Sequence, residues 1–428
     1  MARKMKSSGI EWIGDIPEDW EVVKIKILGN ARNGLAYSNS DLCDKDEGTL
    51  VLRASNIIEG KLTFRDNVYV NKNIPADLMI KDGDILICST NGSKELVGKN
   101  VIIRDVEASF GAFMMVLRCD NPEIMYYILN SSLFDYYKGS FSTTTINQLT
   151  KSNFANMKIP WTRNPKERES ITTFLDKKSL TIEKIKNAII KELQTLEDYK
   201  KSVITEAVTK GLDKNAAMKD SGIEWIGEIP KHWEVIKLKY EVEKIAKGIS
   251  PKYVEEELTP VINQATFSKG YFDNNLNYCS DKPIGDGLLQ KNDVLLATTG
   301  GGVLGKCFFF EEDGKYLAST DVAFIRCKDK AVAKFIYYIF SVSYQLFNGI
   351  YAKGATNQTH LQMNMLSNMQ LPLPSDKELE DIILFLDKMS GKIDDAIAGK
   401  QKQLETLEEY KKSLIYEYVT GKKEVAEC

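Results

Sequence analysis

The chain repeats its own sequence at an interval of about 210 residues, and this duplication constrains the fold more than any other feature. The segment 6–26, which contains Gly-Ile-Glu-Trp-Ile-Gly, returns as segment 219–239. The segment 195–204 returns as segment 406–415. Solenoid repeats have far shorter periods, of roughly 20–50 residues. We therefore expect two copies of one domain pair, related by an internal pseudo-two-fold axis as in a homodimer.

Composition bounds the class of protein. The chain has 428 residues, 43% of them hydrophobic, which is enough for two to four domains with ordinary cores. A net charge of −3 counts mildly against a tight, stand-alone nucleic-acid binder, although local patches or a partner can supply positive charge. We expect no membrane span and no signal peptide. Seven scattered cysteines without a C-x-x-C pair indicate reduced core residues in a cytoplasmic protein.

Each copy is predicted to begin with a Trp/Pro-containing frame segment, 6–26 or 219–239, followed by a variable region. The variable regions, roughly 27–160 and 240–372, differ strongly from each other. Both contain short apolar runs typical of strands and one helical stretch, which indicates an α+β globule. The strand-like runs are 84–88, 101–103, 293–297 and 307–310, and the helical stretches are 123–129 and 333–340.

The third part of each copy is predicted to be a long helix. Pro165 and Gly211 are suited to begin and end the first, and the second runs from about Ser375 to Gly421. About 40 residues at a rise of 1.5 Å make a rod of roughly 60 Å. Apolar spacings of three, four and seven predict that the two helices pack on each other. The predicted seam is Ile182, Ile185, Ile189, Leu196, Tyr199, Val203, Ile393, Leu407, Tyr410 and Leu414, with Glu192, Lys400 and Gln403 interrupting it. Two separate charged surface helices are the alternative.

These patterns divide the chain into four predicted segments. They are a first globular domain (1–164), a central helix (165–211), a second globular domain (212–374) and a C-terminal helix (375–428). Nearly identical frame segments and helices around two divergent variable regions are what a two-part recognition protein requires.

The whole pattern resembles the specificity subunit of a Type I restriction-modification system. The resemblance rests on the two Gly-Ile-Glu-Trp-Ile-Gly segments, the Asn-Gln and Ile/Leu-Pro ends of the variable regions, the Phe-Leu-Asp-Lys starts at 174 and 385, and the Leu-Glu-x-Tyr-Lys-Lys-Ser segments. It implies two target-recognition domains separated by two long antiparallel helices that form a coiled coil. Each domain would read one half of a split double-stranded DNA target, and the helices would set the gap.

The same resemblance implies the partners. Two adenine-N6 methyltransferase subunits would bind this chain, and two restriction subunits that translocate DNA would join in the full complex. S-adenosylmethionine, ATP and Mg²⁺ are expected in those partners alone, with no cofactor in this chain. A Type IIB-like specificity subunit and a coiled-coil assembly protein without a DNA role are the alternatives.

The residues themselves predict no catalysis and no metal site. His232 and His360 stand in no metal-binding spacing, and no methyl-transfer Asn/Asp-Pro-Pro-Tyr/Phe motif is present. Gly300–Lys306 resembles a phosphate-binding loop, but Cys307 replaces the hydroxyl residue that binds Mg²⁺, and a strand-like run follows. We expect a glycine-rich turn there, with a loop that approaches DNA phosphates as the alternative.

DNA contacts are predicted in polar loops that occupy corresponding places in the two variable regions, because readout needs polar side chains at base edges and cations at phosphates. The candidates are Arg32, Asn33, Tyr37, Asn91, Ser93, Lys94, Lys99, Thr143, Thr144, Asn147 and Gln148 in the first region, and Lys252, Tyr253, Thr298, Thr299, Lys306, Lys353, Thr356, Asn357, Gln358 and His360 in the second. The frame tryptophans and the tyrosine pairs at 126, 136 and 337 are expected to pack in cores.

Overall fold

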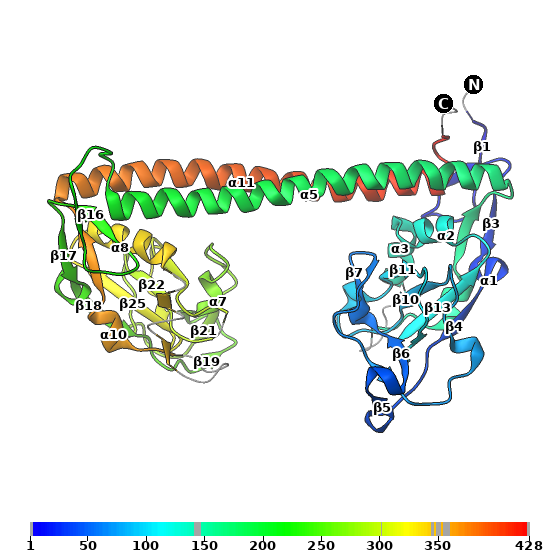
Figure 1. Cartoon of the computed structure of the whole chain (residues 1–428), viewed down its shortest axis with the longest axis horizontal. Helices are drawn as coiled ribbons and strands as arrows, with labels where there is room; N and C mark the ends of the chain where they lie inside the picture. The colour runs from blue at the N-terminus through cyan, green and yellow to red at the C-terminus, as the bar shows by residue number, and fades with distance from the viewer. Residues whose placement is uncertain are drawn as a thin grey trace. The chain divides into compact units, whose positions relative to one another are not determined.

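The computed structural model describes residues 3–140, 147–300, 302–343, 346–347, 352–353 and 360–425. The chain forms two compact units. Unit 1 comprises Met1–Ile190 and Lys402–Cys428, and unit 2 comprises Lys191–Gln401. Each unit therefore holds one frame segment, one variable region and a part of both long helices, as the colours in Figure 1 show.

Unit 1 contains two four-stranded sheets, as the strand pairing shows. The first has the order β11-β10-β13-β4, with bounds Asn100–Ile102, Ile85–Cys88, Met114–Cys119 and Gly29–Asn33. The second has the order β12-β6-β9-β5, with bounds Ser109–Phe110, Thr49–Leu52, Tyr69–Val70 and Leu42–Cys43. Two-stranded pairs complete the unit: β1 (Met5–Ser7) with β2 (Asp15–Pro17), β3 (Glu21–Lys24) with β14 (Lys158–Trp161), and β7 (Ile57–Ile58) with β8 (Lys61–Leu62). Its short helices are α1 (Ile25–Leu28), α2 (Pro122–Leu129), α3 (Ser132–Ser140) and α4 (Lys151–Asn156).

Unit 2 repeats the two four-stranded sheets of unit 1. Its first sheet is β18-β25-β22-β23, with bounds Val242–Lys247, Val322–Cys327, Val294–Ala297 and Cys307–Phe309. Its second is β19-β21-β20-β24, with bounds Tyr253–Val254, Asn277–Cys279, Thr259–Ile262 and Leu317–Ala318. The pairs are β15 (Met218–Asp220) with β16 (Glu228–Pro230), β17 (Glu234–Lys237) with β28 (Gln370–Leu373), and β26 (Ala352–Lys353) with β27 (His360–Leu361). The helices are α6 (Leu238–Glu241), α7 (Gln264–Phe267), α8 (Lys330–Val342) and α10 (Met363–Ser367).

The central strands β10 and β22 are buried on both faces, as their continuous apolar runs predict. Ile85 and Ile87 pack in the core shared with α2, whereas Leu86 and Cys88 pack in a second core behind the sheet. Val294 and Leu296 alternate in the same way with their neighbours in unit 2. This alternation follows the two-residue period of a strand and fixes which face of the sheet each side chain occupies.

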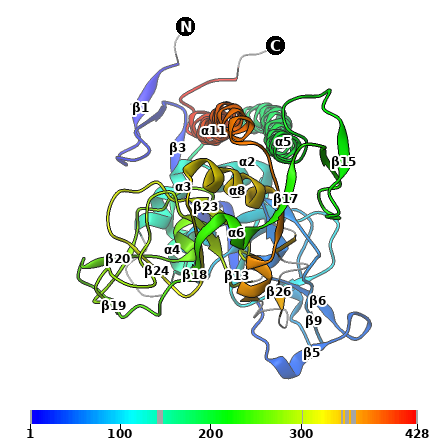
Figure 2. The same ribbon diagram turned by 90° about the vertical axis from the view of Figure 1, so that its left-hand side faces the viewer.

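The two long helices are α5 (Pro165–Lys210) and α11 (Asp376–Val419), and they run antiparallel within each unit. In unit 1 the Lys186 ammonium binds Glu408 at 2.8 Å, and Lys411 binds Glu183 at 2.9 Å. In unit 2 Lys200 binds Asp394 at 2.7 Å. Figure 2 shows the helices side by side. The fold class predicted from the sequence, α+β globules with two long antiparallel helices, is confirmed.

The predicted helix seam is partly wrong. Ile182, Ile189, Ile393 and Leu414 are buried, and Leu196, Val203 and Leu407 are half-buried. Ile185, Tyr199 and Tyr410 are largely exposed.

The physical reason for the exposed positions is that lysines take the adjacent seam positions. The stems of Lys186 and Lys200 occupy the seam while their ammonium groups reach carboxylates on the other helix. Glu192 and Lys400, which interrupt the apolar pattern, bind each other at 2.5 Å.

The frame tryptophans attach each globule to a long helix. The Trp20 indole N–H donates to Glu167 at 3.1 Å, and the Trp233 indole N–H donates to Glu378 at 2.9 Å. Both indoles are buried, so their expected packing role is confirmed. A second repeated bond comes from a tyrosine on α2 or α8, which donates to the aspartate of a Phe-Leu-Asp-Lys segment: Tyr127 to Asp176 at 2.5 Å, and Tyr338 to Asp387 at 2.6 Å.

Candidate nucleic-acid interface

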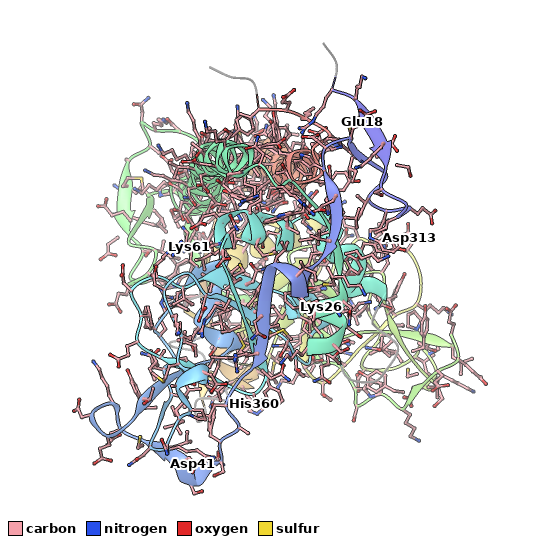
Figure 3. The ribbon with its side chains drawn as sticks, turned by 90° about the vertical axis from the view of Figure 1, so that its right-hand side faces the viewer. Glu18, Lys26, Asp41, Lys61, Asp313 and His360 are labelled. Carbon is pink, nitrogen blue, oxygen red and sulfur yellow. The ribbon has the colours of Figure 1, made fainter. Side chains whose placement is uncertain are left out.

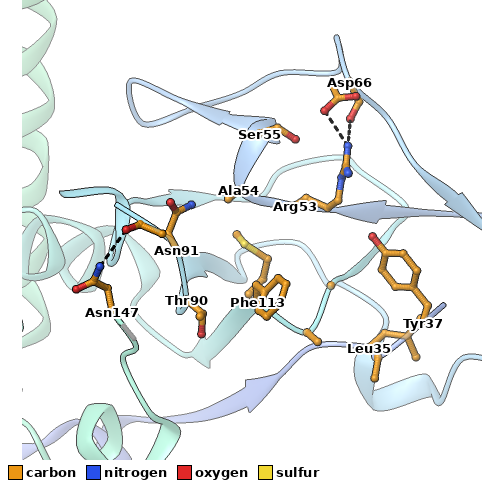
Figure 4. A pocket seen from close by; sticks show the side chains of 15 residues that line it. Leu35, Tyr37, Arg53, Ala54, Ser55, Asp66, Thr90, Asn91, Phe113 and Asn147 are labelled. Atoms are coloured by element: carbon orange, nitrogen blue, oxygen red, sulfur yellow. Dashed lines mark hydrogen bonds and ion pairs between the residues drawn. The ribbon is translucent and has the colours of Figure 1, made fainter. Parts of the chain in front are cut away.

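Three loops predicted to contact DNA meet at one cavity of about 900 Å³ in unit 1. Tyr37, Asn91 and Asn147 each come from a different loop, and all three line this cavity. The Asn147 side-chain amide donates to the carbonyl of Gly92 at 3.1 Å, which fastens two of the loops together. Figure 4 shows the cavity with Asn91 and Asn147 at one side and Tyr37 at the other.

The loop after the buried central strand is joined to the end of the polar loop in both units. In unit 1, Thr90 forms a β-bridge with Gln148, and the Leu149 N–H donates to the carbonyl of Ser89 at 2.7 Å. In unit 2, Thr299 forms the same bridge with His360. The sequence alignment of the two copies predicted that these loops correspond, and the structure brings them together in each unit.

In unit 2, the Leu361 N–H donates to Thr298 at 2.9 Å, in parallel with the bond to Ser89. The hydroxyl of Thr299 donates to the Gln264 side chain at 3.3 Å, which ties the bridge to α7. His360, labelled in Figure 3, is exposed. Lys252 and Tyr253, at the edge strand β19, are also exposed.

Several of the predicted cations are engaged within the protein. Arg32 forms an ion pair with Asp77. The Lys99 ammonium donates to the Ile57 carbonyl at 3.0 Å, and the Lys306 ammonium donates to the Ser268 carbonyl at 2.7 Å. Asn33, Ser93 and Lys94 are exposed at the surface. In this structure, Lys99 and Lys306 hold loops in place.

Thr298 was predicted as a DNA contact, and the structure corrects this. Its side chain is 0% exposed, because the residue continues the buried strand β22 by one position. Five other candidates, Thr143, Thr144, Thr356, Asn357 and Gln358, lie outside the described residues, and of Lys353 the structure describes the main chain in β26.

The cavity residues that sequence reasoning missed include Arg53, Asp66 and Phe113. The guanidinium of Arg53 binds the Asp66 carboxylate at 2.7 Å. Phe113 is 68% exposed at the turn 111–114. A search for polar loops passes over a Gly-Ala-Phe turn, although an aromatic residue directly before a buried strand is a usable signal.

An ion pair with a buried carboxylate lies at the start of the central strand in each unit and was also missed. Arg118 binds Asp84 at 2.6 Å, and Arg326 binds Asp293 at 2.7 Å. Both aspartates are 1% exposed, and each precedes its central strand. Burial raises the pKa of the Asp293 carboxyl, while the hydrogen bond from Arg326 opposes that shift.

The glycine-rich segment 300–306 does not continue as a phosphate-binding loop would. Cys307 begins strand β23 and no helix follows, so amide groups at a helix start are not available here. Burial raises the pKa of the Cys307 thiol to about 12, which keeps this group neutral near pH 7.

Among the described residues, no group of three His, Cys, Asp or Glu side chains is placed to hold a metal ion. No helix in the described part of the chain is long and apolar enough to cross a membrane.

Comparison with known proteins identifies the family. The family described as the Type I restriction modification DNA specificity domain matches this chain twice, at residues 17–195 and 230–406. The chain belongs to this family. The two matches correspond to the two copies of the internal repeat and together span most of the chain.

Individual relatives are distant in sequence. The chain is 28% identical to a candidate type I restriction enzyme MjaX specificity subunit of Methanocaldococcus jannaschii, over 96% of this chain and 95% of that protein. It is 26% identical to the type I restriction enzyme EcoKI specificity subunit of Escherichia coli K12, over 68% of this chain and 63% of that protein. A solved structure on the assembly and conformational transition of the type I R-M system shares the fold, with a TM-score of 0.69 and 15% identity over 94% of this chain and 98% of that one.

Proposed function

We propose that this chain is the non-catalytic DNA-specificity subunit of a Type I restriction-modification complex. Each unit reads one half-site of a split double-stranded DNA target. The observation that carries this proposal is the repeated bridge at the loop ends, Thr90–Gln148 and Thr299–His360, which presents different side chains on the same backbone geometry. One backbone with two sets of side chains suits two half-sites of different sequence.

The surroundings of the bridges support DNA as the ligand. Amide side chains at Asn91 and Asn147, together with the exposed Lys94, provide groups that bind base edges and phosphates. The described ends of these loops are held by main-chain and side-chain hydrogen bonds before any ligand binds, which lowers the entropic cost of association.

Family membership supports the partners that we include in this proposal. Two methyltransferase subunits bind the chain and supply S-adenosylmethionine chemistry, and two restriction subunits supply the ATP- and Mg²⁺-dependent steps. The antiparallel helices α5 and α11 set the gap between the half-sites. The complex acts in the cytoplasm, where its DNA target is located.

Single-molecule sequencing for N6-methyladenine tests the proposal. The chain is co-expressed with the methyltransferase subunit encoded beside it, and a control strain lacks this chain. We expect methylation at one split motif that is present with this chain and absent from the control. A stable complex that adds no methylated motif would contradict the proposed function.

A further inference from the structure

The turn 111–114 in unit 1 is held rigidly by its backbone. The Met114 N–H donates to the carbonyl of Gly111 at 2.8 Å and closes the turn. The carbonyl of Phe113 accepts the N–H groups of Ser89 and Thr90, at 2.9 and 3.1 Å. The turn is therefore fastened to the end of the central strand, next to the bridge that joins the candidate DNA loops.

Unit 2 builds the same turn at residues 319–322. The Val322 N–H donates to the carbonyl of Ser319 at 3.0 Å, and the carbonyl of Asp321 accepts the Thr298 N–H at 2.9 Å. Asp321 thus occupies the place of Phe113.

A glycine faces the turn at very short distance in each unit. A Cβ atom at Gly34 would lie 2.2 Å from the carbonyl oxygen of Gly111, and one at Gly248 would lie 2.3 Å from that of Ser319. The backbone position of the turn is therefore fixed on this side as well, and any larger residue at either glycine would displace it.

The side chains at this shared position differ completely. The Phe113 ring projects at the cavity and is 68% exposed. The Asp321 carboxylate instead accepts the N–H of Gln264 at 3.2 Å and a bond from the Ser319 hydroxyl, so it is engaged within unit 2. Figure 4 shows Phe113 between Thr90 and Asn91 on one side and Leu35 and Tyr37 on the other.

The Phe113 ring, held at a cavity that we propose faces DNA, favours contact with an apolar group of a base. Most of the groups that base pairs present in the major groove are polar donors and acceptors, whereas the thymine 5-methyl group is apolar. Leu35, Tyr37 and Ala112 extend the apolar surface around Phe113, and Asn91 and Asn147 border it with amides that suit the neighbouring polar base edges.

We propose that Phe113 is a specificity-determining residue that contacts the 5-methyl group of a thymine in the half-site read by unit 1. This inference rests on the proposed function and goes beyond it, because it assigns one base pair to one side chain. Unit 2 has no such contact at the equivalent place, where Asp321 stands.

The first test compares methylated motifs from strains that carry the wild-type chain, Phe113→Ala or Phe64→Ala, each with the methyltransferase subunit. Phe64 is 48% exposed and lies in unit 1 outside the cavity lining, so it is the matched control. We expect Phe113→Ala to relax one A·T position in one half-site and to leave the other half-site unchanged. Phe64→Ala should keep the wild-type motif.

The second test replaces the thymine at that position with deoxyuridine, which lacks the 5-methyl group alone. The purified wild-type complex should methylate the deoxyuridine substrate about fourfold more slowly, the effect of one lost apolar carbon contact. Phe113→Ala should treat the two substrates alike, and Phe113→Leu should retain part of the preference.

The possible outcomes distinguish a failure of the proposed function from a failure of the role given to Phe113. A wild-type complex without any motif contradicts the proposed function. A wild-type motif that Phe113→Ala leaves unchanged overturns this inference while the function stands. A wild-type complex that is indifferent to deoxyuridine also overturns it, and if Phe113→Ala nevertheless weakens methylation equally on both substrates, the ring acts between base pairs instead.

Discussion

At the residue scale, two ion pairs hold buried carboxylates, Asp84–Arg118 and Asp293–Arg326. A buried carboxylate that loses its ion-pair partner is costly, because burial removes most of the water that would otherwise solvate the charge. Each pair lies at the start of a central strand, because the aspartate precedes the strand and the candidate DNA loops follow its other end. The pairs therefore fix the start of the strands that lead into the recognition loops.

Removing one partner of the pair in unit 2 should destabilise that unit. Arg326→Met leaves the Asp293 carboxylate buried, and we expect a loss of about 3 kcal/mol. Amide hydrogen exchange of β22 measures this locally, which matters because a chain of two units need not unfold in one step. As the control, Lys291→Met breaks the exposed pair with Asp313 and should leave the protection of β22 unchanged. Equal protection in both variants would contradict the role given to Asp293–Arg326.

At the scale of elements, the helix pair depends on charge as well as on apolar packing. Glu192 and Lys400 looked like interruptions of two seams, yet they bind each other across them. In unit 1, the ion pairs Lys186–Glu408 and Glu183–Lys411 lie beside the buried Ile182 and Ile189. Their register joins α5 and α11 in antiparallel orientation.

This arrangement predicts a pH dependence for the helix pair in unit 1. The hydrogen bond from Lys411 holds the pKa of the Glu183 carboxyl below its ordinary value of 4.5. A lowered folded-state pKa means that the contribution to stability is present above pH 4.5 and is lost as the pH falls through the folded-state value.

We expect Glu183→Gln to be less stable than the wild type by up to about 1 kcal/mol at pH 7, because the pair is partly exposed. The difference should shrink as the pH falls below 4.5. Hydrogen exchange of the helix amides near residues 183 and 411, followed from pH 7 to pH 3.5, gives the measurement. A difference that stays constant over this range would show that the ion pair does not act through Glu183 ionisation.

At the scale of the whole molecule, the end of each long helix packs on one of the two frame segments. Gly211, at the end of α5, lies against Pro230 and Trp233 of the second frame segment. Gly421, after α11, lies in the same way against Pro17 and Trp20 of the first. Each helix end therefore packs on a frame segment, and the first frame segment receives the helix of the second copy. Segment 6–26 and the end of α11 therefore lie together in unit 1.

Circular permutation should therefore preserve the fold and the target. Joining residue 428 to residue 1 links Gly421 to the first frame segment by at least as many residues as link Gly211 to the second. New ends between Asp213 and Lys214 open an exposed turn. We expect the permuted chain to direct methylation to the wild-type motif, as sequencing for N6-methyladenine would show. A cut within the buried strand β22 is the control and should abolish the folded chain.

The sequence by itself determined the duplication, the fold class and the location of the candidate loops. Periodicity and repeated motifs carry this information, because apolar spacing reports which face of an element is buried. The start of α5 at Pro165, the central strands and the correspondence of the polar loops in the two units could all be predicted.

Tertiary structure alone decided which side chains reach the surface of the site. Thr298 is polar and lies in the core, whereas Phe113 is apolar and lies exposed at the cavity. Ile185 and Tyr199 are turned out of the helix seam, and Lys186 and Lys200 are turned into it. These outcomes depend on partners far away in the sequence, such as Glu408 and Asp394, and on one residue of register, which local patterns do not specify.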